Sequence, residues 1–544
     1  MVLVGDWDTT MRKALAQQDN AVFKVAMALV VGTATLWLYR AHDQQQRKKR
    51  LSVDAKGNPR KLRELPRVPN ALPLLGNMIE VIRNGPRIYD WTLDYCRKFK
   101  GEPWIRSFFG IEIVCFSTPD AVEEIATTQF ENFIKGKFQT DLLEDLFGRG
   151  LVTADGERWY HQRKTAVKFF TARSLRAFMT QSMHKNIEKV CQVLEDGVKN
   201  DEWVDLRKLF QEFTLQTFVE MALGVEFDWI GTKESHPFYD AMDNAPMTLV
   251  SRFRRPTWWW KLARYLNVGP EAKLANEVST IRTWMQEVLE KSLANLNEKP
   301  KRTIDGEEVK SVVELFVEQS EEDADGVRPE DFIDFLQTFM FASRDTTALT
   351  LTWLFYVLGQ HPHVVQAIRE EIKRKLPDQV GRKDVYLTTE HTRLLVYLEA
   401  TIKEVLRLHP VAPTTMKKVV KDTVICGDIP LYEGQMVSIS SYSLARNTDV
   451  WGPDASDFKP ERWINAETGE LIHVPLSKFF SFHAGPRTCV GMNLAMLELR
   501  VVLANLFNRF DFEIDPSNDG SYSPSPLLLM KHVLHAKIKP APLV

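Results

Sequence analysis

The sequence predicts a mainly α-helical protein with small β-sheets, preceded by a single N-terminal transmembrane helix. Apolar residues recur at the three-and-four spacing of a buried helical face along most of the chain. Stretches with strand character are short, the clearest being residues 111–116 and 437–442. Residues 21–39 form the longest apolar stretch, and neither an internal repeat nor a low-complexity segment is visible.

Length and composition allow a large buried core and disfavour nucleic acid as a partner. The chain has 544 residues, of which 44% are hydrophobic, which is enough apolar surface for a sizeable core. Its formal net charge of -2 lacks the basic excess of proteins that bind nucleic acid. Five cysteines, an odd number with scattered spacing, favour a reducing compartment.

We predict that residues 1–40 are a membrane anchor and that residues 41–65 are a basic linker. The apolar stretch 21–39 is interrupted only by Lys24, and about 20 helical residues are needed to cross a bilayer. Basic residues follow it at Arg40 and at 47–50, so the positive-inside rule leaves the rest of the chain in the cytosol. A cleaved signal peptide is disfavoured, because no small-residue cleavage site follows the apolar run.

Residues 479–491, with the sequence FFSFHAGPRTCVG, place one cysteine in a tight loop. An apolar helix follows directly, so Cys489 is expected at a helix N-terminus, where unpaired N–H groups and the helix dipole favour the thiolate. Gly485 and Gly491 allow positive φ or a close approach of the backbone to a flat ligand. A lone cysteine is more often a small buried hydrophobe. A zinc site is disfavoured, since no second Cys or His lies at ligand spacing.

The spacing within this loop resembles the haem-binding loop of the cytochrome P-450 family, the haem-thiolate monooxygenases. The matching positions of the pattern F-x-x-G-x-R-x-C-x-G are Phe482, Gly485, Arg487, Cys489 and Gly491. The resemblance implies that Cys489 is the axial ligand of the iron of haem b (iron protoporphyrin IX) and that the other four residues belong to the cofactor site. It implies the cytochrome P-450 fold, as a catalytic domain, over residues 66–544.

A glutamate and two arginines resemble a buried ion network of the same family. Glu404 and Arg407 are three residues apart on a predicted helix and can pair, although such a pair on a surface is worth little. Residues 458–463, FKPERW, resemble the loop whose arginine, here Arg462, completes the network. The resemblance implies that these three residues brace the cysteine loop and do no chemistry.

The apolar stretch 339–351, FMFASRDTTALTL, carries polar residues in the middle of a predicted helix. Such residues are costly unless they serve a purpose, although a threonine can bond back to a carbonyl one turn earlier. The stretch resembles the family's central-helix motif, in which an acid and an alcohol relay protons to dioxygen. Asp345 and Thr346 match these positions, whereas Ser343 departs from the glycine that is common in the family.

Trp159 and Arg163 lie one helical turn apart and resemble the pair that contacts the haem propionates. Arg487 is expected to join them, because carboxylates prefer a forked guanidinium. The basic residues around them are Arg158, Lys164, Lys168, Arg173 and Arg176. They form either a solvated face or a docking patch for an acidic electron donor. NADPH-cytochrome reductase or a similar donor is expected, since the chain has no flavin or nicotinamide fingerprint.

Within the family, residues 140–166, the ASRDTT motif at 342–347 and residues 411–463 are most similar to the fatty-acid and alkane ω-hydroxylases. This implies hydroxylation of a small hydrophobic substrate such as a fatty acid, with O2 and with electrons from NADPH. Residues 140–150, 411–416 and 525–530 resemble segments that line the substrate pocket. Candidates for holding a substrate carboxylate are Lys135, Lys137 and Arg254, each of which is otherwise a solvated residue.

The resemblance also implies a place in the endoplasmic reticulum membrane, single-pass, with the catalytic domain on the cytosolic side. Membrane lipid is therefore an expected partner. Residues 258–260, three tryptophans that follow several arginines, suit either a membrane interface or the end of a core helix.

Other functions stay open on the sequence alone. A sterol or xenobiotic hydroxylase of the same family is one. A relative that rearranges hydroperoxides is a second, and a non-catalytic haem protein is a third.

Overall fold

The computed structural model describes residues 42–542, with gaps at 44, 55, 73–74, 109–110, 233–235, 299–302, 305–306, 323–328, 381 and 383–384. The predicted anchor, residues 1–40, lies outside the described residues and stays a prediction. In the part of the chain that is described, no helix is both long and apolar enough to cross a bilayer.

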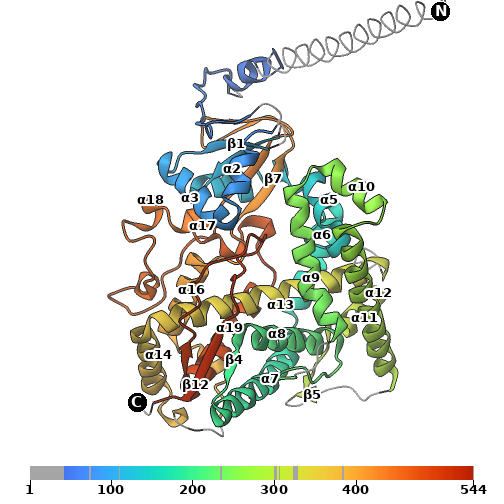
Figure 1. Ribbon diagram of the computed structural model, residues 1–544, viewed down its shortest axis with the longest axis vertical. Helices are drawn as coiled ribbons and strands as arrows, with labels where there is room; N and C mark the ends of the chain where they lie inside the picture. Colours follow the sequence, from blue (N-terminus) through green and yellow to red (C-terminus); the bar gives the residue numbers. More distant parts are fainter. Residues whose placement is uncertain are drawn as a thin grey trace, which may run out of the picture. The chain divides into compact units, whose positions relative to one another are not determined.

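Helices make up most of the described chain (Figure 1). They are α2 (Met78–Arg83), α3 (Ile88–Lys98), α4 (Pro119–Glu123), α5 (Gly136–Phe147), α6 (Gly156–Thr171), α7 (Arg173–Asn200), α8 (Leu206–Leu223), α9 (Pro237–Val250), α10 (Thr257–Tyr265), α11 (Pro270–Glu298), α12 (Val312–Glu322), α13 (Pro329–Gln360), α14 (Pro362–Lys375), α15 (Thr389–Thr392), α16 (Val396–Leu408), α17 (Ser441–Ala445), α18 (Thr448–Trp451) and α19 (Met492–Arg509). Proline occupies the first position of several, where its missing N–H costs nothing and its fixed φ suits the helix.

Within the described ranges the strands are short and form four small sheets. They are β1 (Trp104–Phe108), β2 (Ile111–Phe116), β3 (Phe133–Ile134), β4 (Trp203–Asp205), β5 (Thr303–Ile304), β6 (Glu307–Glu308), β7 (Thr415–Val419), β8 (Thr423–Ile425), β9 (Ile429–Leu431), β10 (Met436–Ile439), β11 (Phe510–Ile514) and β12 (His535–Pro540). The largest sheet has the order β1-β2-β10-β7-β3, and only the β2–β10 pair in it is parallel. A second sheet has the order β11-β12-β4. The prediction of a mainly α-helical protein with small sheets is confirmed.

The predicted strand at 437–442 ends earlier than expected. β10 stops at Ile439, and the Ser440 side chain accepts a hydrogen bond from the N–H of Ser443, which starts α17. The alternation of apolar and polar residues predicted a longer strand. The strand ends earlier because the Ser440 side chain caps the N-terminus of a helix, which replaces strand pairing at this point.

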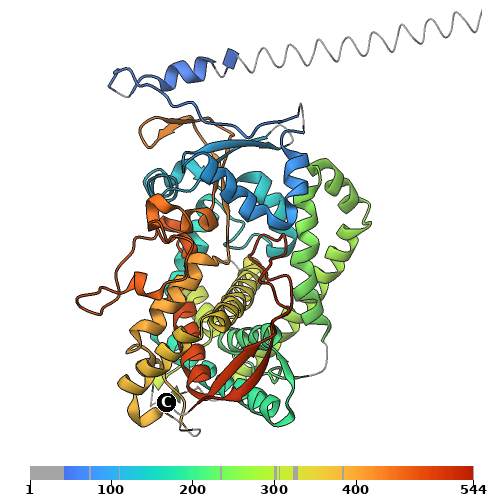
Figure 2. The same cartoon turned by 60° about the vertical axis from the view of Figure 1, so that its left-hand side comes forward.

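Two compact units divide the described chain. The larger comprises Leu65–Val420 and Gln435–Val544. In it, α13 runs through the middle with helices packed on several sides, as the turned view of Figure 2 shows. One core forms where the second half of α13 meets α7, α16 and α19, and another forms where its first half meets α8, α9 and α11. The long central helix therefore supports both cores.

The described part of the smaller unit comprises residues 42–64, with gaps at 44 and 55, and Lys421–Gly434. This part contains the β8–β9 hairpin and much of the predicted basic linker. Two of the linker's arginines pair with aspartates of this unit. Arg47 Nη1 lies 3.2 Å from Asp422 Oδ1, and Arg63 Nε lies 3.0 Å from Asp428 Oδ2. Part of the linker's positive charge is therefore compensated within the protein.

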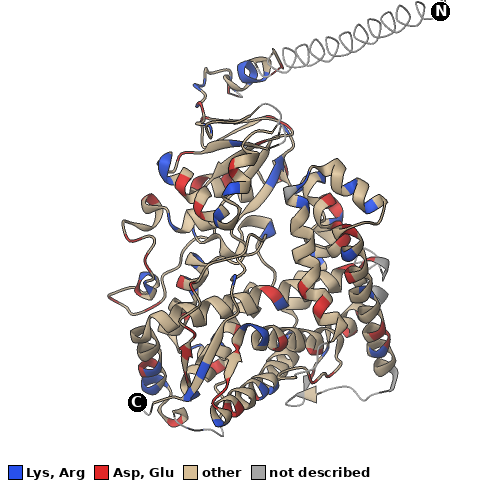
Figure 3. Cartoon of the chain, viewed as in Figure 1, with Lys and Arg blue, Asp and Glu red and all other residues tan. Residues whose placement is uncertain are grey.

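Acidic and basic residues are interspersed along the helices in the view of Figure 3. Ion pairs link many of them, among them Arg252 with Glu271 at 2.5 Å and Arg500 with Glu399 at 2.6 Å. This distribution agrees with the near-neutral net charge of the sequence.

Candidate active site

The cysteine loop is held by its own backbone and by two unusual conformations. The N–H of Cys489 donates to the carbonyl oxygen of Phe482 at 2.9 Å. His483 and Gly485 have φ values of 59° and 63°, in the left-handed region. A Cβ at Gly485 would lie 2.0 Å from the carbonyl oxygen of Ala126, so this position requires glycine.

Gly491, in contrast, has an ordinary φ of -85°. A Cβ there would meet only the Cys489 sulfur, at 4.0 Å. Of the two roles expected for this glycine, Gly491 does not have a positive φ, and a close approach of the backbone to a flat ligand stays a prediction.

A cavity of about 340 Å³ separates the cysteine loop from α13. The loop contributes Phe482, His483, Arg487 and Cys489, and α13 contributes Phe339, Ala342, Ser343, Thr346, Thr347 and Thr350. Trp159 and Arg163 line it from α6. The structure thus brings together, from three distant parts of the chain, all but two of the predicted catalytic and cofactor-binding residues. The exceptions are Asp345 and Gly485, which are not among the cavity-lining residues that are described.

One end of the cavity is strongly basic. Lys135, Lys417 and Arg487 line it together with Arg163. Burial lowers the pKa of Lys135 to about 8 and that of Lys417 to about 7, and Arg487 adds to both shifts. Burial also lowers the pKa of Arg487 to about 10, against the opposing effect of Asp155. These shifts are typical of buried cations that have too few negative neighbours.

Arg487 has unused donors at this basic end. Its Nη2 donates to the Ala154 carbonyl at 3.0 Å and to Asp155 Oδ1 at 2.8 Å. Its Nε and Nη1 are buried and have no hydrogen-bond partner among the described residues. The guanidinium also lies over the Trp159 ring, 4.2 Å from its centroid. A ligand with carboxylates next to Arg487 would satisfy these donors and the two lysines.

The residues present therefore fit an iron porphyrin with two carboxylates. Cys489 offers a sulfur ligand, the basic end offers partners for the carboxylates, and the rest of the lining is largely apolar. In the protein chain alone, burial raises the pKa of Cys489, whereas the Gly491 N–H and Arg163 lower it. The N–H at the helix start therefore favours the thiolate, as expected, but in the protein chain alone burial outweighs it. A bound metal ion reverses this, because it deprotonates a coordinating thiol.

Thr346 and Asp345 are neighbours in sequence but are directed differently. The Thr346 hydroxyl lines the cavity and donates to the Ala342 carbonyl at 2.6 Å. The Asp345 carboxylate accepts from Arg344 Nη1 at 3.0 Å. Burial raises the pKa of Asp345, and Arg344 opposes this rise. The Ser343 hydroxyl lies 3.2 Å from the Met340 carbonyl and also lines the cavity.

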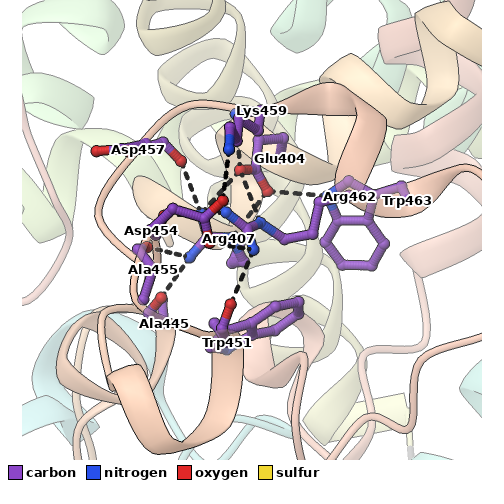
Figure 4. A network of polar contacts seen from close by, with 10 residues as sticks. All are labelled: Glu404, Arg407, Ala445, Trp451, Asp454, Ala455, Asp457, Lys459, Arg462 and Trp463. Atoms are coloured by element: carbon purple, nitrogen blue, oxygen red, sulfur yellow. Dashed lines mark hydrogen bonds and ion pairs between the residues drawn. The ribbon is translucent and has the colours of Figure 1, made fainter.

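The predicted glutamate and arginines meet in one buried network (Figure 4). Glu404 and Arg407 are 0% and 1% exposed, and two bonds of 2.8 Å join them. Arg462 Nε lies 3.4 Å from Glu404 Oε1. The Lys459 N–H and Trp463 Nε1 also donate to Glu404, at 3.0 and 2.9 Å.

The same network fixes the segment that precedes the cysteine loop. Arg407 donates to the carbonyls of Ala445, Ala455 and Asp457. Arg462 donates to the Trp451 carbonyl at 2.8 Å and to Asp454. The Trp463 ring then packs edge-on against Phe479 at the start of the cysteine loop, with ring centroids 4.9 Å apart. The residues of the network do not themselves line the cavity. Leu406, on the same helix as Glu404 and Arg407, does line it, and the Ser481 hydroxyl of the cysteine loop donates to the Leu406 carbonyl at 2.7 Å.

Three residues of the site were missed by the sequence analysis. Lys417 lies on β7, His483 is hydrogen-bonded to the Thr415 hydroxyl at 2.7 Å, and Glu498 lines the cavity from α19. Burial lowers the pKa of His483 to about 3, so the ring is neutral, and raises the pKa of Glu498 to about 8. Only Glu498 had a signal in the sequence that could have identified it, because a charged residue at a core position of a helix is unusual.

Only some of the other predicted lining and binding residues lie at the cavity. Of the three predicted pocket segments, 411–416 supplies Val411, Ala412 and Thr415, whereas 140–150 and 525–530 supply none of the described lining residues. Among the carboxylate candidates, Lys135 lines the cavity and Lys137 is exposed beside Asp141. The side chain of Arg254 lies outside the described residues.

A second, larger cavity of about 1460 Å³ also reaches Cys489. Its basic lining residues are Arg163, Arg173, Arg176, Lys185, Arg393, Lys403 and Arg500, and its acidic ones are Glu188, Glu390 and Glu399. Arg163, Arg173 and Arg176 belong to the basic region noted in the sequence. Cations thus outnumber carboxylates around this concave surface.

Comparison with known proteins identifies similar sequences along most of the chain. The sequence model of a family described as cytochrome P-450 matches residues 66–540. A cytochrome P-450 monooxygenase of Mycosarcoma maydis is 31% identical over 82% of this chain and 69% of its own length. A cytochrome P-450 of Arabidopsis thaliana, of subfamily 94B, is 30% identical over 87% of this chain and 91% of its own length. An alkane hydroxylase of Arabidopsis thaliana is 28% identical over 86% of this chain and 92% of its own length.

Proposed function

Because the chain belongs to the cytochrome P-450 family of haem-thiolate monooxygenases, we propose that it hydroxylates the terminal carbon of a fatty acid. The observation that carries this proposal is the largely apolar lining of the cavity. Its apolar residues include Leu151, Val152, Phe170, Phe218, Phe339, Ala342 and Val411. Such a lining favours an aliphatic chain by the hydrophobic effect. The similarity to an alkane hydroxylase supports the same class of substrate.

Different residues of the chain bind the cofactor, position the substrate and supply protons in this proposal. When bound, haem supplies the reductive activation of O2 that inserts oxygen into a C–H bond, with the Cys489 thiolate as its ligand. Arg487, Lys135 and Lys417 would hold its carboxylates. The apolar lining excludes water and holds the chain end, because selection of a terminal methyl over its weaker C–H neighbours requires positioning. Thr346 carries an exchangeable proton at the cavity, and Asp345 replaces it.

Electrons are proposed to arrive from NADPH through a separate acidic reductase. The concave basic surface that reaches Cys489 supports this, since opposite charges steer two proteins into contact. A single-pass anchor at residues 1–40 is proposed to hold the protein at the endoplasmic reticulum membrane. The exposed residues of α10 support contact with lipid: Trp258 and Trp259 are 64% and 51% exposed, while Trp260 is buried against Arg252.

Product analysis tests the substrate. The haem-loaded protein is given NADPH, a generic reductase and a matched pair of substrates, a saturated fatty acid and the alkane of equal chain length. Mass spectrometry then locates any new hydroxyl group. We expect hydroxylation of the fatty acid at its terminal carbon. Hydroxylation of the alkane alone would move the assignment to alkanes, and product only from sterols or xenobiotics would contradict it. Conversion of a hydroperoxide without NADPH would identify a rearranging enzyme instead.

The role of Cys489 has its own test. Cys489→Ala is expected to abolish the red-shifted absorption that reduced haem-thiolate protein gives with carbon monoxide, because that absorption requires a thiolate ligand. Cys426→Ala is the matched control, since Cys426 lies on the β8–β9 hairpin of the other unit. Retention of the absorption in Cys489→Ala would place the ligand elsewhere.

A further inference from the structure

The basic linker carries a serine that the proposed mechanism does not use. Residues 41–65 contain eight lysines and arginines and three aspartates and glutamates, a formal charge of +5. Four of the cations are consecutive, at 47–50, and they are followed by Leu51 and Ser52. Ser52 therefore has cations at each of the positions from two to five residues before it. Protein kinases recognise their substrates by charge patterns of this kind.

The two cations nearest to Ser52 along the chain are accessible. The side chain of Arg50 is 71% exposed and reaches Asp422 only at 4.0 Å. Lys49 is exposed as well. Arg47, in contrast, is 25% exposed and pairs with two aspartates, at 2.7 and 3.2 Å. A protein with an acidic surface can therefore bind Lys49 and Arg50 without first breaking a strong ion pair.

Ser52 lies at the C-terminal end of the linker's short helix, residues 45–51. Its hydroxyl donates to the Lys49 carbonyl at 2.7 Å, and its own carbonyl accepts from the Arg60 N–H at 2.6 Å. The serine is partly exposed. A helix this short is marginally stable, and its ends open at little cost in free energy. Local opening of the helix end is therefore enough to present the hydroxyl to an enzyme.

Thr165 shows that upstream cations alone are not sufficient. It follows Arg163 and Lys164 directly, but it is 1% exposed and lies in the middle of α6. An enzyme could reach its hydroxyl only if α6 unfolded. The linker serine, in contrast, combines upstream cations with an accessible position.

We propose that Ser52 is a phosphorylation site for a protein kinase whose substrate-binding surface is acidic, and that its phosphate releases the linker from anionic lipid. Carboxylates of the kinase bind Lys49 and Arg50 and so select this serine. The Ser52 Oγ attacks the γ-phosphorus of ATP, the bond from that phosphorus to the β–γ bridging oxygen breaks, and ADP leaves. The hydroxyl proton passes to a carboxylate base of the kinase.

The phosphate weakens the helix end to which it is attached. The esterified oxygen carries no hydrogen, so the hydrogen bond to the Lys49 carbonyl is lost. A phosphate at this position is also repelled by the negative end of the helix dipole, which disfavours the last helical turn.

The phosphate also lowers the charge that the linker presents to a membrane. It adds about 1.5 to 2 negative charges at neutral pH, so the formal charge of residues 41–65 falls from +5 to about +3. Polybasic segments beside a membrane bind anionic lipid, and each charge removed weakens that binding by roughly fivefold. This step rests on the proposed anchor, which would hold the linker at a bilayer.

Phosphorylation of the full-length protein tests the site itself. The chain is incubated with ATP and a purified kinase that requires Arg or Lys two and three residues before its serine, and mass spectrometry locates the phosphate. We expect most chains to carry phosphate at Ser52 and none to carry it at Thr165. Ser52→Ala should remove the linker phosphate.

Two charge-matched double variants test recognition. Lys49→Ala with Arg50→Ala removes the two cations before Ser52 and should slow phosphorylation by roughly tenfold or more. Lys56→Ala with Lys61→Ala removes the same charge after the serine, also at exposed positions, and should leave the rate unchanged. No phosphate on Ser52, or equal rates in the two double variants, would overturn the proposal.

Hydrogen exchange tests the consequence for lipid contact. Full-length protein is placed in bilayer discs of neutral lipid, or of the same lipid mixed with phosphatidylserine, and exchange is followed in residues 45–52. In the unmodified protein, phosphatidylserine should slow exchange by roughly fivefold or more. In the phosphorylated protein, the two lipids should give nearly equal rates. An equal slowing before and after phosphorylation would overturn the release from lipid.

These outcomes separate the inference from the proposed function. Phosphorylation of Ser52 depends neither on haem nor on substrate or lipid. If the full-length protein fails to enter the discs, the proposed anchor and the lipid step are both contradicted, while a phosphate found at Ser52 still supports the site. Release from lipid without any fatty-acid product would support the inference and contradict the proposed hydroxylase.

Discussion

Glu498 shows how a single buried carboxyl couples stability to pH. It lies on α19, is 6% exposed and lines the cavity. Burial raises its pKa from 4.5 to about 8, although Thr347 opposes the rise. The folded protein therefore binds a proton at neutral pH that the unfolded chain has released.

Glu498→Gln should therefore remove part of the pH dependence of stability. Between pH 4.5 and about 8 the folded state holds more protons at this position than the unfolded state, so the wild-type free energy of unfolding falls as pH rises, by up to roughly 1.4 kcal/mol per pH unit. The glutamine variant lacks this slope. Denaturant midpoints measured across this pH range check it. The two proteins should be alike at low pH and should diverge upward from pH 4.5, with the variant the more stable.

Glu467→Gln is the matched control, because Glu467 is exposed. It should follow the wild type at every pH. Parallel curves for Glu498→Gln and the wild type would mean that Glu498 is ionised in the folded protein.

At this scale the sequence predicted residue types better than their directions. The pattern around Cys489 identified the loop, and the structure places Trp159, Arg163 and Arg487 at the same cavity. It was not possible to foresee that Asp345 would face Arg344, because that depends on where α8 and α9 pack. The burial of Lys417 could not be predicted either. Side chains of β7 alternate between the two faces of the sheet, and the strands that pair with β7 come from distant parts of the chain.

Helix α16 carries a fully buried acid, Glu404. Glu404 accepts hydrogen bonds from Arg407, Lys459 and Trp463 and lies near Arg462. Glu404→Gln should lower the free energy of unfolding by about 3–5 kcal/mol, because it leaves buried arginine charge uncompensated. Urea unfolding measures this, and loss of haem should accompany it if the network braces the cysteine loop.

Asp454→Asn is a matched control from the edge of the same network. Its carboxylate pairs with Lys459 at 2.6 Å and Arg462 at 3.1 Å, but its side chain is 31% exposed. Its substitution should cost much less than that of Glu404. A similar loss of unfolding free energy in both variants would mean that the network depends on the number of carboxylates in it and not on the buried position of Glu404.

Spacing predicted the pairing of Glu404 with Arg407, since residues three apart share a helical face. The other donors, Lys459 and Trp463, come from a short 3-10 turn and the residue before it, which no periodic pattern predicts. The end of β10 at Ile439 is another case. Ser440 caps the helix that follows, and the sequence analysis missed this cap because the alternating pattern continued through it.

At the scale of the whole molecule, membrane contact is predicted at two places, residues 1–40 and α10. On the protein lacking residues 1–40, the double substitution Trp258→Ala and Trp259→Ala should weaken binding to phospholipid vesicles. We expect about tenfold per tryptophan, or ~1.4 kcal/mol of apolar transfer for each half-buried ring. Vesicle co-sedimentation measures it.

Trp203→Ala is the control, since Trp203 is 44% exposed on β4, away from α10 in the sequence. It should leave vesicle binding unchanged. Equal losses for the two sites, or no loss for α10, would contradict a specific lipid contact there.

The family itself was predictable because its motifs are local and ordered along the chain, and the match over residues 66–540 confirms it. The substrate was not predictable to the same degree. Only one of three expected pocket segments lines the described cavity, because side-chain direction depends on packing between helices that are far apart in sequence.

The largest sheet also determines when the protein can fold during its synthesis. Ile113 of β2 pairs with Met436 of β10, roughly 300 residues later. A ribosome adds about 5–20 residues per second, so β2 emerges on the order of 15–60 s before its parallel partner exists. Throughout that interval one edge of β2 is an unpaired strand edge, the feature that recruits other chains. The nascent N-terminal half is therefore the species that a chaperone must protect, and Cys489 reaches the cavity only when translation is nearly complete.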